Sequence, residues 1–355
     1  MSNIYKLFQL QGDFIDCAPY GSGHINDTFK LTLNQAGTHI SYILQRLNTT
    51  IFTDPVGLMD NIERVTTHLG AKITGRDASR RTLHIVPALD GKNHAVDADG
   101  RFWRCYWFIE KAAAYNVLPG EKPAFEAAKT FANFQRLLAD LPAPRLNETI
   151  PDFHNTPKRF AALKAAAKAD KLGRLASARP EFDFFMAHDD EASRLLDAGL
   201  PERITHNDTK LNNVMLDDET KEGVCVIDLD TVMPGLIHYD FGDMIRTGTS
   251  PAAEDETDLG KVTMRFNMFE ALLRGYLTGA AGFLTPEERE LLPFAGKLIT
   301  MEIGTRFLTD YLNGDVYFKI HRPEHNLDRC RTQVALAKSI ETRMPEMMKL
   351  ARSIK

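Results

Sequence analysis

The sequence predicts an α+β fold of two lobes: a small β-rich N-terminal lobe of residues 1–110 and a larger, mainly α-helical C-terminal lobe of residues 111–355. Strand-forming residues dominate the chain from about residue 14 to residue 110, whereas helical spacing dominates after Pro119-Gly120. The length of 355 residues also favours two lobes over a single core. Two lobes of these kinds are expected to meet at a cleft, a common place for a ligand.

The N-terminal lobe is predicted to be a small sheet accompanied by one helix. Turn-forming Gly, Asn and Asp residues separate short runs of β-branched and aromatic residues, which is the pattern of consecutive strands. The helix is expected over residues 55–69, where apolar side chains recur near helical spacing. The predicted strands cover residues 14–20, 28–33, 40–47, 82–88 and 102–110.

The C-terminal lobe is predicted to consist of helices, interrupted by short strands only within residues 204–231. Amphipathic spacing over long segments supports this, and neither a repeat nor a low-complexity linker divides the lobe further. The predicted helices cover residues 122–138, 157–178, 182–197, 258–277, 285–311 and 327–353.

Composition excludes several classes of protein. The net charge of −5 and the pI near 6.1 give no basic surface for nucleic acid or an anionic membrane. The chain holds no apolar run of about 18 residues, and its N-terminus lacks the layout of a signal peptide. Four scattered cysteines fit a reducing compartment. We therefore expect a cytoplasmic protein without nucleic-acid or membrane partners; the oligomeric state is not set by any pattern, and a monomer is compatible.

The segment around residues 204–230 indicates the chemistry. His206, Asp208 and Asn213 form an H-x-D-x-x-x-x-N pattern, and the next apolar run ends at Asp228. This layout is typical of the phosphoryl-transfer site of protein-kinase-like enzymes. One carboxylate there orients the attacking hydroxyl, while an amide and a second carboxylate hold Mg²⁺ on the nucleotide phosphates. Asp208 is thus predicted to be catalytic, and Asn213 and Asp228 to be metal ligands. The Asp-x-x-x-x-Asn spacing alone also occurs among turn residues of ordinary loops.

Two other acidic residues compete with Asp228 for the metal. Asp230 stands two positions further along, so strand alternation places both carboxylates on one side and cannot select between them. Asp240 begins a literal Asp-Phe-Gly, but it lies further from Asp208 than one short hairpin spans. We therefore assign Asp228 to Mg²⁺ and expect Asp240 to brace the catalytic loop.

A phosphate-binding loop and a cation are expected on the nucleotide side. Gly21, Ser22 and Gly23 lie between two predicted strands, where backbone N–H groups can cradle phosphates. Arg46 ends the third predicted strand and could neutralise the phosphates, with Glu63 on the following helix as its ion-pair partner. An ordinary hairpin turn and a surface arginine on an edge strand are the simpler alternatives.

The strand that leaves the N-terminal lobe is a candidate hinge. It is rich in aromatic residues and reaches Phe108 and Ile109, whose backbone would pair with adenine. The same aromatic side chains could instead only fill the interface between the lobes, and both interpretations are compatible.

Several segments resemble the aminoglycoside-phosphotransferase-like kinases, namely residues 42–48, 204–213, 226–235 and 239–246. Within that superfamily the chain is most similar to the bacterial N-acetylhexosamine 1-kinases over nearly its whole length, including residues 302–318. The resemblance implies ATP- and Mg²⁺-dependent phosphorylation of the anomeric (C1) hydroxyl of N-acetylglucosamine or N-acetylgalactosamine. Asp208 would face that hydroxyl, and the product would be the sugar 1-phosphate.

Sugar contacts are expected from donors with several N–H groups and from aromatic edges, because the substrate carries many hydroxyls. Arg306 and Tyr317 are the first candidates, followed by His24 and Arg246. Glu302 stands four residues before Arg306, so an ordinary helix ion pair is the alternative for this arginine.

Two other functions remain open at this point. A different small-molecule kinase would act on an aminoglycoside, a choline-like amine or a homoserine-like alcohol. A cationic substrate needs an acidic, aromatic pocket, and the cluster at residues 254–258 could supply charge, although it also fits a polar loop. The non-enzymatic alternative is a nucleotide-binding pseudokinase, and intact Asp208, Asn213 and Asp228 argue against it.

Overall fold

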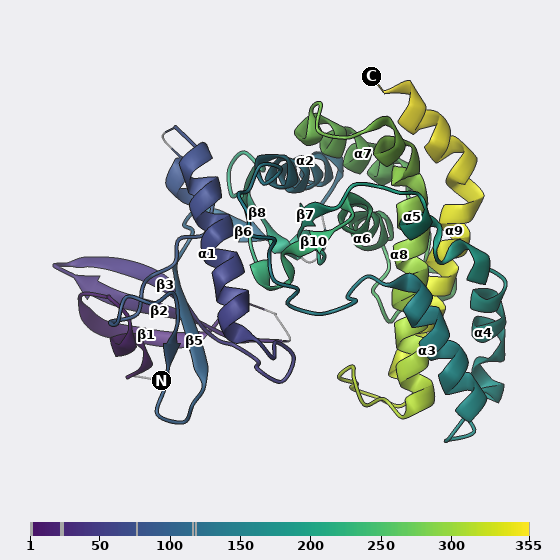
Figure 1. Ribbon diagram of the computed structural model, residues 1–355, viewed down its shortest axis with the longest axis horizontal. Helices are drawn as coiled ribbons and strands as arrows, with labels where there is room; N and C mark the ends of the chain where they lie inside the picture. The colour runs from purple at the N-terminus through teal and green to yellow at the C-terminus, as the bar shows by residue number, and fades with distance from the viewer. Residues whose placement is uncertain (1–2, 22–24, 76, 116, 118, 355) are drawn as a thin grey trace.

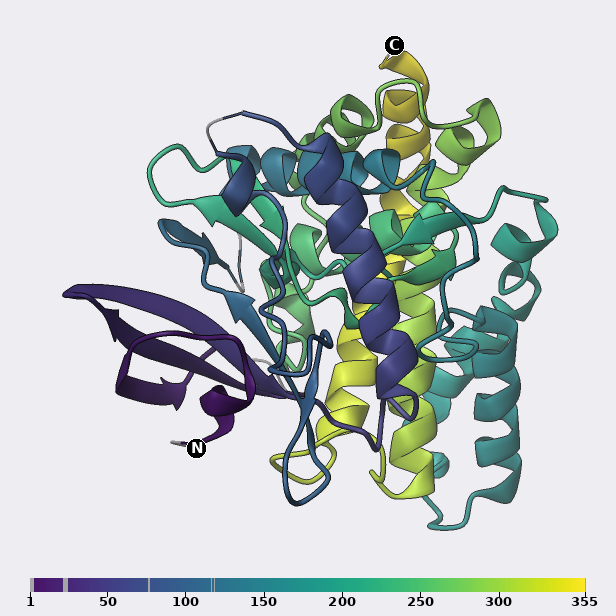
Figure 2. The same cartoon turned by 60° about the vertical axis from the view of Figure 1, so that its left-hand side comes forward.

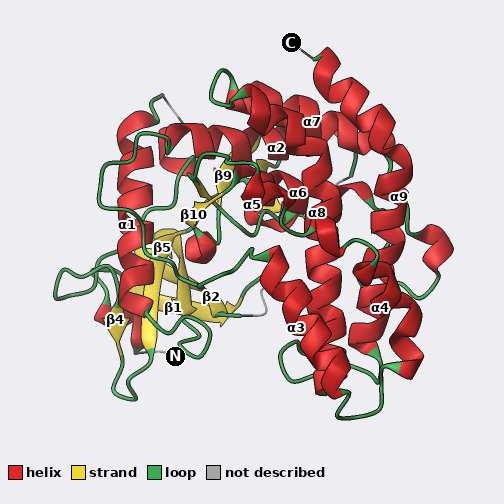
Figure 3. Ribbon diagram, turned by 45° about the vertical axis from the view of Figure 1, so that its right-hand side comes forward, coloured by secondary structure: helices red, strands yellow, loops and turns green. Residues whose placement is uncertain are grey.

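The computed structural model describes residues 3–21, 25–75, 77–115, 117 and 119–354. A β-sheet forms one end of the molecule and a group of long helices forms the other, with helix α1 (Pro55–Lys72) beside the sheet (Figure 1, Figure 3). The two-lobed α+β fold predicted from the sequence is therefore confirmed. The boundary at residue 110 stays a prediction.

The sheet has five antiparallel strands in the order β1-β2-β3-β5-β4. Ala36 and Gly37, both at positive φ, form the tight turn between β2 and β3, as a two-residue hairpin requires. Leu31, Leu33 and Leu44 point into the sheet's own hydrophobic core. The strands are β1 (Asp13–Pro19), β2 (Asp27–Gln35), β3 (Thr38–Arg46), β4 (Ala95–Val96) and β5 (Phe102–Trp107).

Helix α1 begins with Asp54 as its N-cap, whose side chain accepts a hydrogen bond from the Gly57 N–H at 2.9 Å. Its apolar face, including Met59 and Ile62, belongs to the large hydrophobic core that also contains most of the helical part. Figure 2 shows α1 running across the front of the molecule. The sheet has a mostly separate hydrophobic core. Tyr106 of β5 is an exception, because its side chain packs in the larger core.

Long helices pack closely in the C-terminal part. Helix α2 lies against α7, where a methyl group added to Gly275 or Gly279 would stand 2.1–2.2 Å from a backbone oxygen of α2. Glycine is therefore required for this close approach. The helices are α2 (Glu121–Leu137), α3 (Thr156–Ala169), α4 (Arg179–Met186), α5 (Arg194–Asp197), α6 (Ile237–Thr249), α7 (Phe266–Ala280), α8 (Pro286–Asn313) and α9 (His325–Ser353). Among the described residues, no helix is both long and apolar enough to cross a membrane.

Four predicted elements differ from the structure. Residues 82–88 form only isolated bridges to neighbouring chain segments, since Pro87 has no N–H to donate to a strand partner. The helix expected over 157–178 ends at Ala169, where Asp170 adopts a left-handed conformation. The helix expected over 182–197 breaks after Met186, and the one expected from residue 258 begins at Phe266. Apolar residues recur at helical spacing on both sides of these breaks, so the spacing alone did not predict where the helices end or begin.

Short strands carry the segment between residues 203 and 235. Strand β7 (Arg203–Thr205) pairs with β10 (Met233–Gly235), and β8 (Val214–Asp217) forms a hairpin with β9 (Gly223–Val226) that extends onto β6 (Ala112–Ala114). Two single 3-10 turns, Leu211–Asn213 and Leu229–Thr231, flank the β8–β9 hairpin. This arrangement holds the predicted catalytic segments against the helices.

Candidate active site

The β8–β9 hairpin brings the two predicted metal ligands to the same end. Val214 pairs with Val226, and the N–H of Ile227 donates to the Asn213 carbonyl at 2.9 Å. Asn213 therefore lies beside the chain that continues into Asp228. Asp228 has φ of 59°, a left-handed conformation that turns the chain sharply after the strand.

Asp208 lies next to Asn213 in the loop that follows β7. The Asn213 amide nitrogen donates to the Asp208 carbonyl at 2.8 Å and to its Oδ2 at 3.3 Å. Lys210 Nζ lies 2.9 Å from the same Oδ2. Among the described residues, none donates a hydrogen bond to the other oxygen, Oδ1. One oxygen of Asp208 thus remains available to a substrate hydroxyl.

The charge of Lys210 keeps Asp208 ionised. Burial alone would raise the pKa of Asp208, but the Lys210 ammonium and its hydrogen bond lower it below the ordinary value. In return, Asp208 raises the pKa of Lys210. A carboxylate that stays ionised can orient an attacking hydroxyl without removing its proton early, which suits the loose transition state of phosphoryl transfer.

Asp240 braces the catalytic loop, as expected. Its Oδ2 accepts the His206 N–H at 2.9 Å, and its Oδ1 accepts the Asn207 N–H at 2.6 Å. The Thr209 hydroxyl donates to the Asp240 carbonyl at 2.5 Å. Asp240 is fully buried at the start of α6, so it fixes the loop on both sides of Asn207.

His206 orients the backbone of the same loop. Its Nε2 lies 2.9 Å from the Ile227 carbonyl, and its Nδ1 faces the Asp208 N–H at 3.3 Å. The first contact requires a donor and the second an acceptor, so a neutral ring with its proton on Nε2 satisfies both. His206 therefore ties the catalytic loop to the strand end that precedes Asp228.

The structure separates the roles of Asp228 and Asp230. Arg104 and Asn26 bind the two carboxylate oxygens of Asp230, which is buried. The carboxylate of Asp228 makes no hydrogen bond or ion pair with any described residue. Burial, followed by the charges of Asp230 and Asp208, raises the pKa of Asp228 to about 6. Asp228 and Asp208 are therefore near enough to repel each other.

The available oxygen donors fit a hard divalent cation. The amide nitrogen of Asn213 is engaged by Asp208, which leaves its oxygen as a free acceptor among the described residues. Together with the unpartnered carboxylate of Asp228 it forms the kind of sparse oxygen set that Mg²⁺ uses when phosphates and water complete the shell. The assignment of Asn213 and Asp228 to Mg²⁺ stays a prediction.

The predicted ion pair between Arg46 and Glu63 is wrong. Arg46 pairs with Asp27 on the neighbouring strand, its cross-strand partner in the register. Glu63 is exposed on α1 and accepts a hydrogen bond from Asn93 at 2.7 Å. Arg46 binds Asp27 instead of Glu63 on α1, because Asp27 lies directly opposite it on the neighbouring strand. Binding of phosphates by Arg46 stays a prediction.

The proposed phosphate loop and hinge are described only in part. Gly21 has φ of 79° in the loop after β1, whereas Ser22, Gly23 and His24 lie outside the described residues. Phe108 follows β5, and its N–H donates to the Ser41 carbonyl at 3.3 Å, so this N–H is not open to adenine. Among the described residues, nothing bonds the Phe108 carbonyl or the Glu110 N–H.

That pair of groups suits the hinge prediction, because one acceptor and one donor two residues apart can match an adenine edge. Ile109 between them is buried in the larger hydrophobic core. The segment therefore joins the sheet to the helical part, and its Phe108 carbonyl and Glu110 N–H find no partner among the described residues.

Arg306 is surrounded by aromatic rings. Its guanidinium carbon lies 5.5–5.9 Å from the ring centres of Phe153, Tyr317 and Phe318. Its guanidinium forms no hydrogen bond or ion pair with any described residue. The helix ion pair with Glu302 is absent, because both oxygens of Glu302 are bound elsewhere. Arg306 thus presents free donors beside the exposed ring of Tyr317.

A buried histidine connects this region to the catalytic loop. His154 Nδ1 lies 2.8 Å from Glu302 Oε1, and its Nε2 lies 2.8 Å from the Asn207 carbonyl. Both partners are acceptors, so only the imidazolium form can donate to both. Burial alone would lower the pKa of His154, but Glu302 raises it above its ordinary value.

This pair predicts a pH-dependent stability. A histidine whose pKa is higher in the folded state stabilises the fold fully below its unfolded pKa of about 6.5, and this contribution is lost as the pH rises through the folded pKa. Replacing His154 with Gln should cost about 3 kcal/mol or more near pH 6, as expected for a broken buried pair. The cost should shrink toward pH 9, measured by urea unfolding across the pH range. His39→Gln, at an exposed position, is the control. A cost independent of pH would contradict the charged pair.

Arg246 is buried between two carboxylates. Its Nε lies 2.8 Å from Asp243 Oδ1, and its Nη1 lies 2.9 Å from Glu254. Its charge also contributes to lowering the pKa of Asp208, where burial is the largest influence in the opposite direction. Asp243 Oδ2 is buried and has no hydrogen-bond partner among the described residues. Direct contact of Arg246 with a sugar stays a prediction.

The carboxylates of the acidic cluster at residues 254–258 form contacts within the protein. Glu254 pairs with Arg246, Asp255 with His325, and Glu256 with Lys261. Asp258 caps the short turn at Gly260. These carboxylates are therefore not available together as a pocket for a cationic substrate.

Sequence reasoning missed several residues of this region. Lys210 carried a signal, since it stands two positions after the catalytic aspartate. Asp243 follows directly after Asp-Phe-Gly and could also have been noticed. Arg104 and His154 carried none, because their partners lie far away in the sequence.

The sequence and the fold are similar to those of known phosphotransferases. The chain matches the model described as the phosphotransferase enzyme family (APH) over residues 16–290. An aminoglycoside phosphotransferase from Alicyclobacillus acidocaldarius subsp. acidocaldarius DSM 446 has a TM-score of 0.65 at 12% identity, covering 100% of this chain and 97% of that chain. A microcompartment-associated aminopropanol kinase has a TM-score of 0.57 at 14% identity over 98% of both chains.

The streptomycin–ATP ternary complex of APH(2")-IIa has a TM-score of 0.50 at 12% identity, covering 96% of both chains. At such low identity these structures show a shared fold. The family model, in contrast, spans most of the sequence, including the catalytic loop and the β8–β9 hairpin. The chain therefore belongs to the phosphotransferase enzyme family.

Proposed function

We propose that this phosphotransferase uses ATP and Mg²⁺ to phosphorylate the anomeric (C1) hydroxyl of an N-acetylhexosamine, GlcNAc or GalNAc, giving the sugar 1-phosphate. Asp208 is the base that orients the hydroxyl. The observation that carries the proposal is Arg306, a guanidinium without a carboxylate partner among the described residues, ringed by aromatic side chains. Such a group suits a neutral, oxygen-rich acceptor.

The charges around Arg306 argue against a cationic acceptor. Arg159 lies near enough that the charge of Arg306, after burial, lowers the pKa of Arg159. The Nε of Arg159 is buried and finds no hydrogen-bond partner in the part of the chain that the structure describes. Two neighbouring guanidinium groups would repel the ammonium group of a choline-like or aminoglycoside substrate. Hydroxyl and acetamide oxygens, in contrast, would accept their N–H groups.

The chain's own residues supply the remaining steps. Asp208 accepts a hydrogen bond from the C1 hydroxyl through its open Oδ1. It takes the proton as the C1 oxygen bonds to the γ-phosphorus of ATP and the bond from that phosphorus to the departing ADP breaks. Lys210, bound to the other oxygen of Asp208, is placed to neutralise charge on the transferred phosphoryl group. Asp243 Oδ2 offers a buried acceptor for another substrate hydroxyl. Asn213 and Asp228 would hold Mg²⁺, which supplies charge neutralisation on the phosphates when bound.

A panel of acceptors tests this proposal. Purified protein with Mg-ATP is incubated with N-acetylhexosamines, neutral hexoses, choline, ethanolamine, homoserine and aminoglycosides, and ADP release is measured. ADP release that depends on N-acetylhexosamines, with a product phosphorylated at C1 by NMR, is the expected result. ADP release with amines alone would instead indicate the other small-molecule kinase, which phosphorylates a choline-like amine or an aminoglycoside. ATP binding without any acceptor-dependent release would indicate a pseudokinase.

Arg306 should determine the affinity for the acceptor. Arg306→Gln is expected to raise the KM for the sugar about tenfold or more, the usual consequence of losing hydrogen bonds from a charged donor. The KM for ATP should stay within about twofold, because Arg306 is proposed to contact only the acceptor. Steady-state kinetics with each substrate varied in turn measures the two KM values separately. Arg194→Gln is the matched control, since Arg194 also lies over an aromatic ring, at 4.3 Å from the centre of Phe294. An equal rise in both KM values would argue against a sugar contact.

A further inference from the structure

A buried polar chain joins the β-sheet to the catalytic segments. Arg104 of β5 binds Asp230 Oδ1, and Arg104 Nε donates to Gln45 of β3 at 2.9 Å. Asn26, directly before β2, donates to Asp230 Oδ2 at 2.5 Å. Each oxygen of Asp230 is therefore held by a residue of the sheet or its flank. Arg104 is 1% exposed and Asp230 is 3% exposed, so water screens this contact little.

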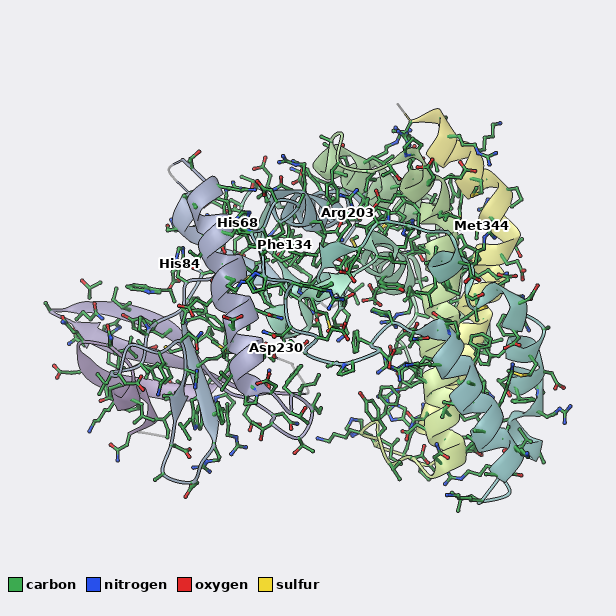
Figure 4. All side chains as sticks on the ribbon, viewed as in Figure 1. His68, His84, Phe134, Arg203, Asp230 and Met344 are labelled. Carbon is green, nitrogen blue, oxygen red and sulfur yellow. The ribbon has the colours of Figure 1, made fainter. Side chains whose placement is uncertain are left out.

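The other side of Asp230 is bonded to the catalytic loop. The hydroxyl of the next residue, Thr231, donates to the His206 carbonyl at 2.7 Å. The Asn207 amide nitrogen donates to the Thr231 carbonyl at 2.9 Å. Two sets of hydrogen bonds, joined by the peptide link between Asp230 and Thr231, thus connect the sheet to the residue before Asp208. Figure 4 shows Asp230 where the sheet and the helical part meet.

We propose that Asn26, Arg104 and Asp230 form an interlobe latch, a positioning device that fixes the sheet relative to the metal-binding turn and the catalytic loop. The three residues do not touch the reacting atoms. The proposal rests on the family's phosphotransferase chemistry, in which a nucleotide must contact both lobes at once. It does not depend on which acceptor is phosphorylated.

The packing of the molecule gives the latch its importance. The sheet buries most of its apolar side chains in a core of its own, while α1 and the C-terminal helices share the larger core. Apolar contacts alone therefore hold the sheet less specifically than they hold α1. A directional ion pair and hydrogen bond can select one orientation of the sheet, which apolar packing does not.

Asn26→Asp isolates the latch contact. The Asn26 Oδ1 accepts the Asn48 N–H at 3.0 Å, and an aspartate retains that acceptor. Only the amide group that faces Asp230 is replaced, so two carboxylate oxygens would confront each other at the present 2.5 Å. We expect binding of Mg-adenylyl imidodiphosphate, measured by isothermal titration calorimetry, to weaken about tenfold or more, as for a lost hydrogen bond to a charged group.

The reciprocal exchange tests whether the contact itself is responsible. In the double variant Asn26→Asp with Asp230→Asn, the new amide at 230 can donate to the new carboxylate at 26. Nucleotide affinity should rise at least about threefold above that of Asn26→Asp, a coupling that unrelated structural damage would not produce. It should stay below wild type, because the amide at 230 can accept from Arg104 but carries no charge to pair with it. A double variant no better than Asn26→Asp, or an Asn26→Asp protein that binds as wild type, would overturn the proposal.

Three further measurements keep the result interpretable. Asn34→Asp adds the same charge elsewhere on β2 and keeps its own contact with the Gly37 N–H, so nucleotide affinity should not change. The two tryptophans, Trp103 and Trp107, both lie on β5, and their fluorescence reports whether the sheet is folded. If Asn26→Asp does not fold, Asn26→Ala must weaken nucleotide binding instead, and unchanged affinity would refute the latch. The analogue needs no acceptor, so a wrong sugar assignment would leave this test unaffected.

Discussion

Replacing Asp208 with Asn is expected to lower kcat by about 10²–10⁴-fold, the usual contribution of a positioned base. The amide keeps the shape of the side chain and can still contact Asn213, but it carries no charge and cannot take the proton. Lys210 then loses its partner at 2.9 Å. Initial-rate assays at saturating ATP and acceptor measure the effect on kcat directly, and the KM values should change much less.

The fold should tolerate this change, because Asp240 rather than Asp208 holds the loop backbone. The thermal midpoint should therefore stay within a few degrees of wild type. Asp189→Asn is a matched control: it breaks a comparable Lys–Asp pair, with Lys164 at 2.6 Å, away from the catalytic loop. Retention of activity within about twofold in Asp208→Asn would remove Asp208 from the mechanism.

Local patterns in the sequence predicted much of this site. The H-x-D-x-x-x-x-N spacing and the apolar run that follows it identified Asp208, Asn213 and Asp228 together, because a short hairpin fixes their separation. The role of Asp240 followed from its greater distance along the chain. The inferred proximity of these residues held, because neighbouring residues along the chain determine it. Their roles in catalysis and metal binding stay predictions.

Contacts between distant segments could not be predicted in this way. Arg46 was given Glu63 as its partner from an expected order of elements, but the register of β2 and β3 places Asp27 opposite it. Arg104 is a buried cation beside the turn that contains Asp228, and its partner Asp230 stands far along the chain. A single sequence gives no measure of such pairings, since the residues carry no spacing that links them.

The choice between Asp228 and Asp230 shows the same limit. Alternation in the sequence could not separate them, and the structure separates them by their neighbours. Asp230 is neutralised by Arg104, whereas Asp228 is left unpartnered among the described residues with a raised pKa. A site that keeps an unneutralised carboxylate costs the fold stability, and such a cost is common where a ligand later supplies the missing charge.

Asp228→Asn should therefore abolish the strengthening of nucleotide binding by Mg²⁺ while leaving the metal-free protein at least as stable as wild type. Burial, then Asp230 and Asp208, raises the pKa of Asp228 to about 6, so its ionised form is disfavoured in the folded state. The charge destabilises the fold as the pH rises from the unfolded pKa of about 3.9 through 6, and below that range both proteins should unfold alike. Thermal unfolding from pH 3 to 8 in EDTA measures this difference.

Activity should change in the opposite direction. At limiting Mg²⁺ the variant is expected to lose about 10²-fold or more in kcat/KM, because the charge stabilisation of the transition state by a held metal amounts to several kcal/mol. Metal-free ATP should bind Asp228→Asn at least as well as wild type, since one carboxylate no longer repels the phosphates, but Mg²⁺ should no longer strengthen binding. Asp218→Asn, an exposed carboxylate at the far turn of the same hairpin, is the control. A variant that is less stable yet still responds normally to Mg²⁺ would show that Asp228 supports the fold and does not hold the metal.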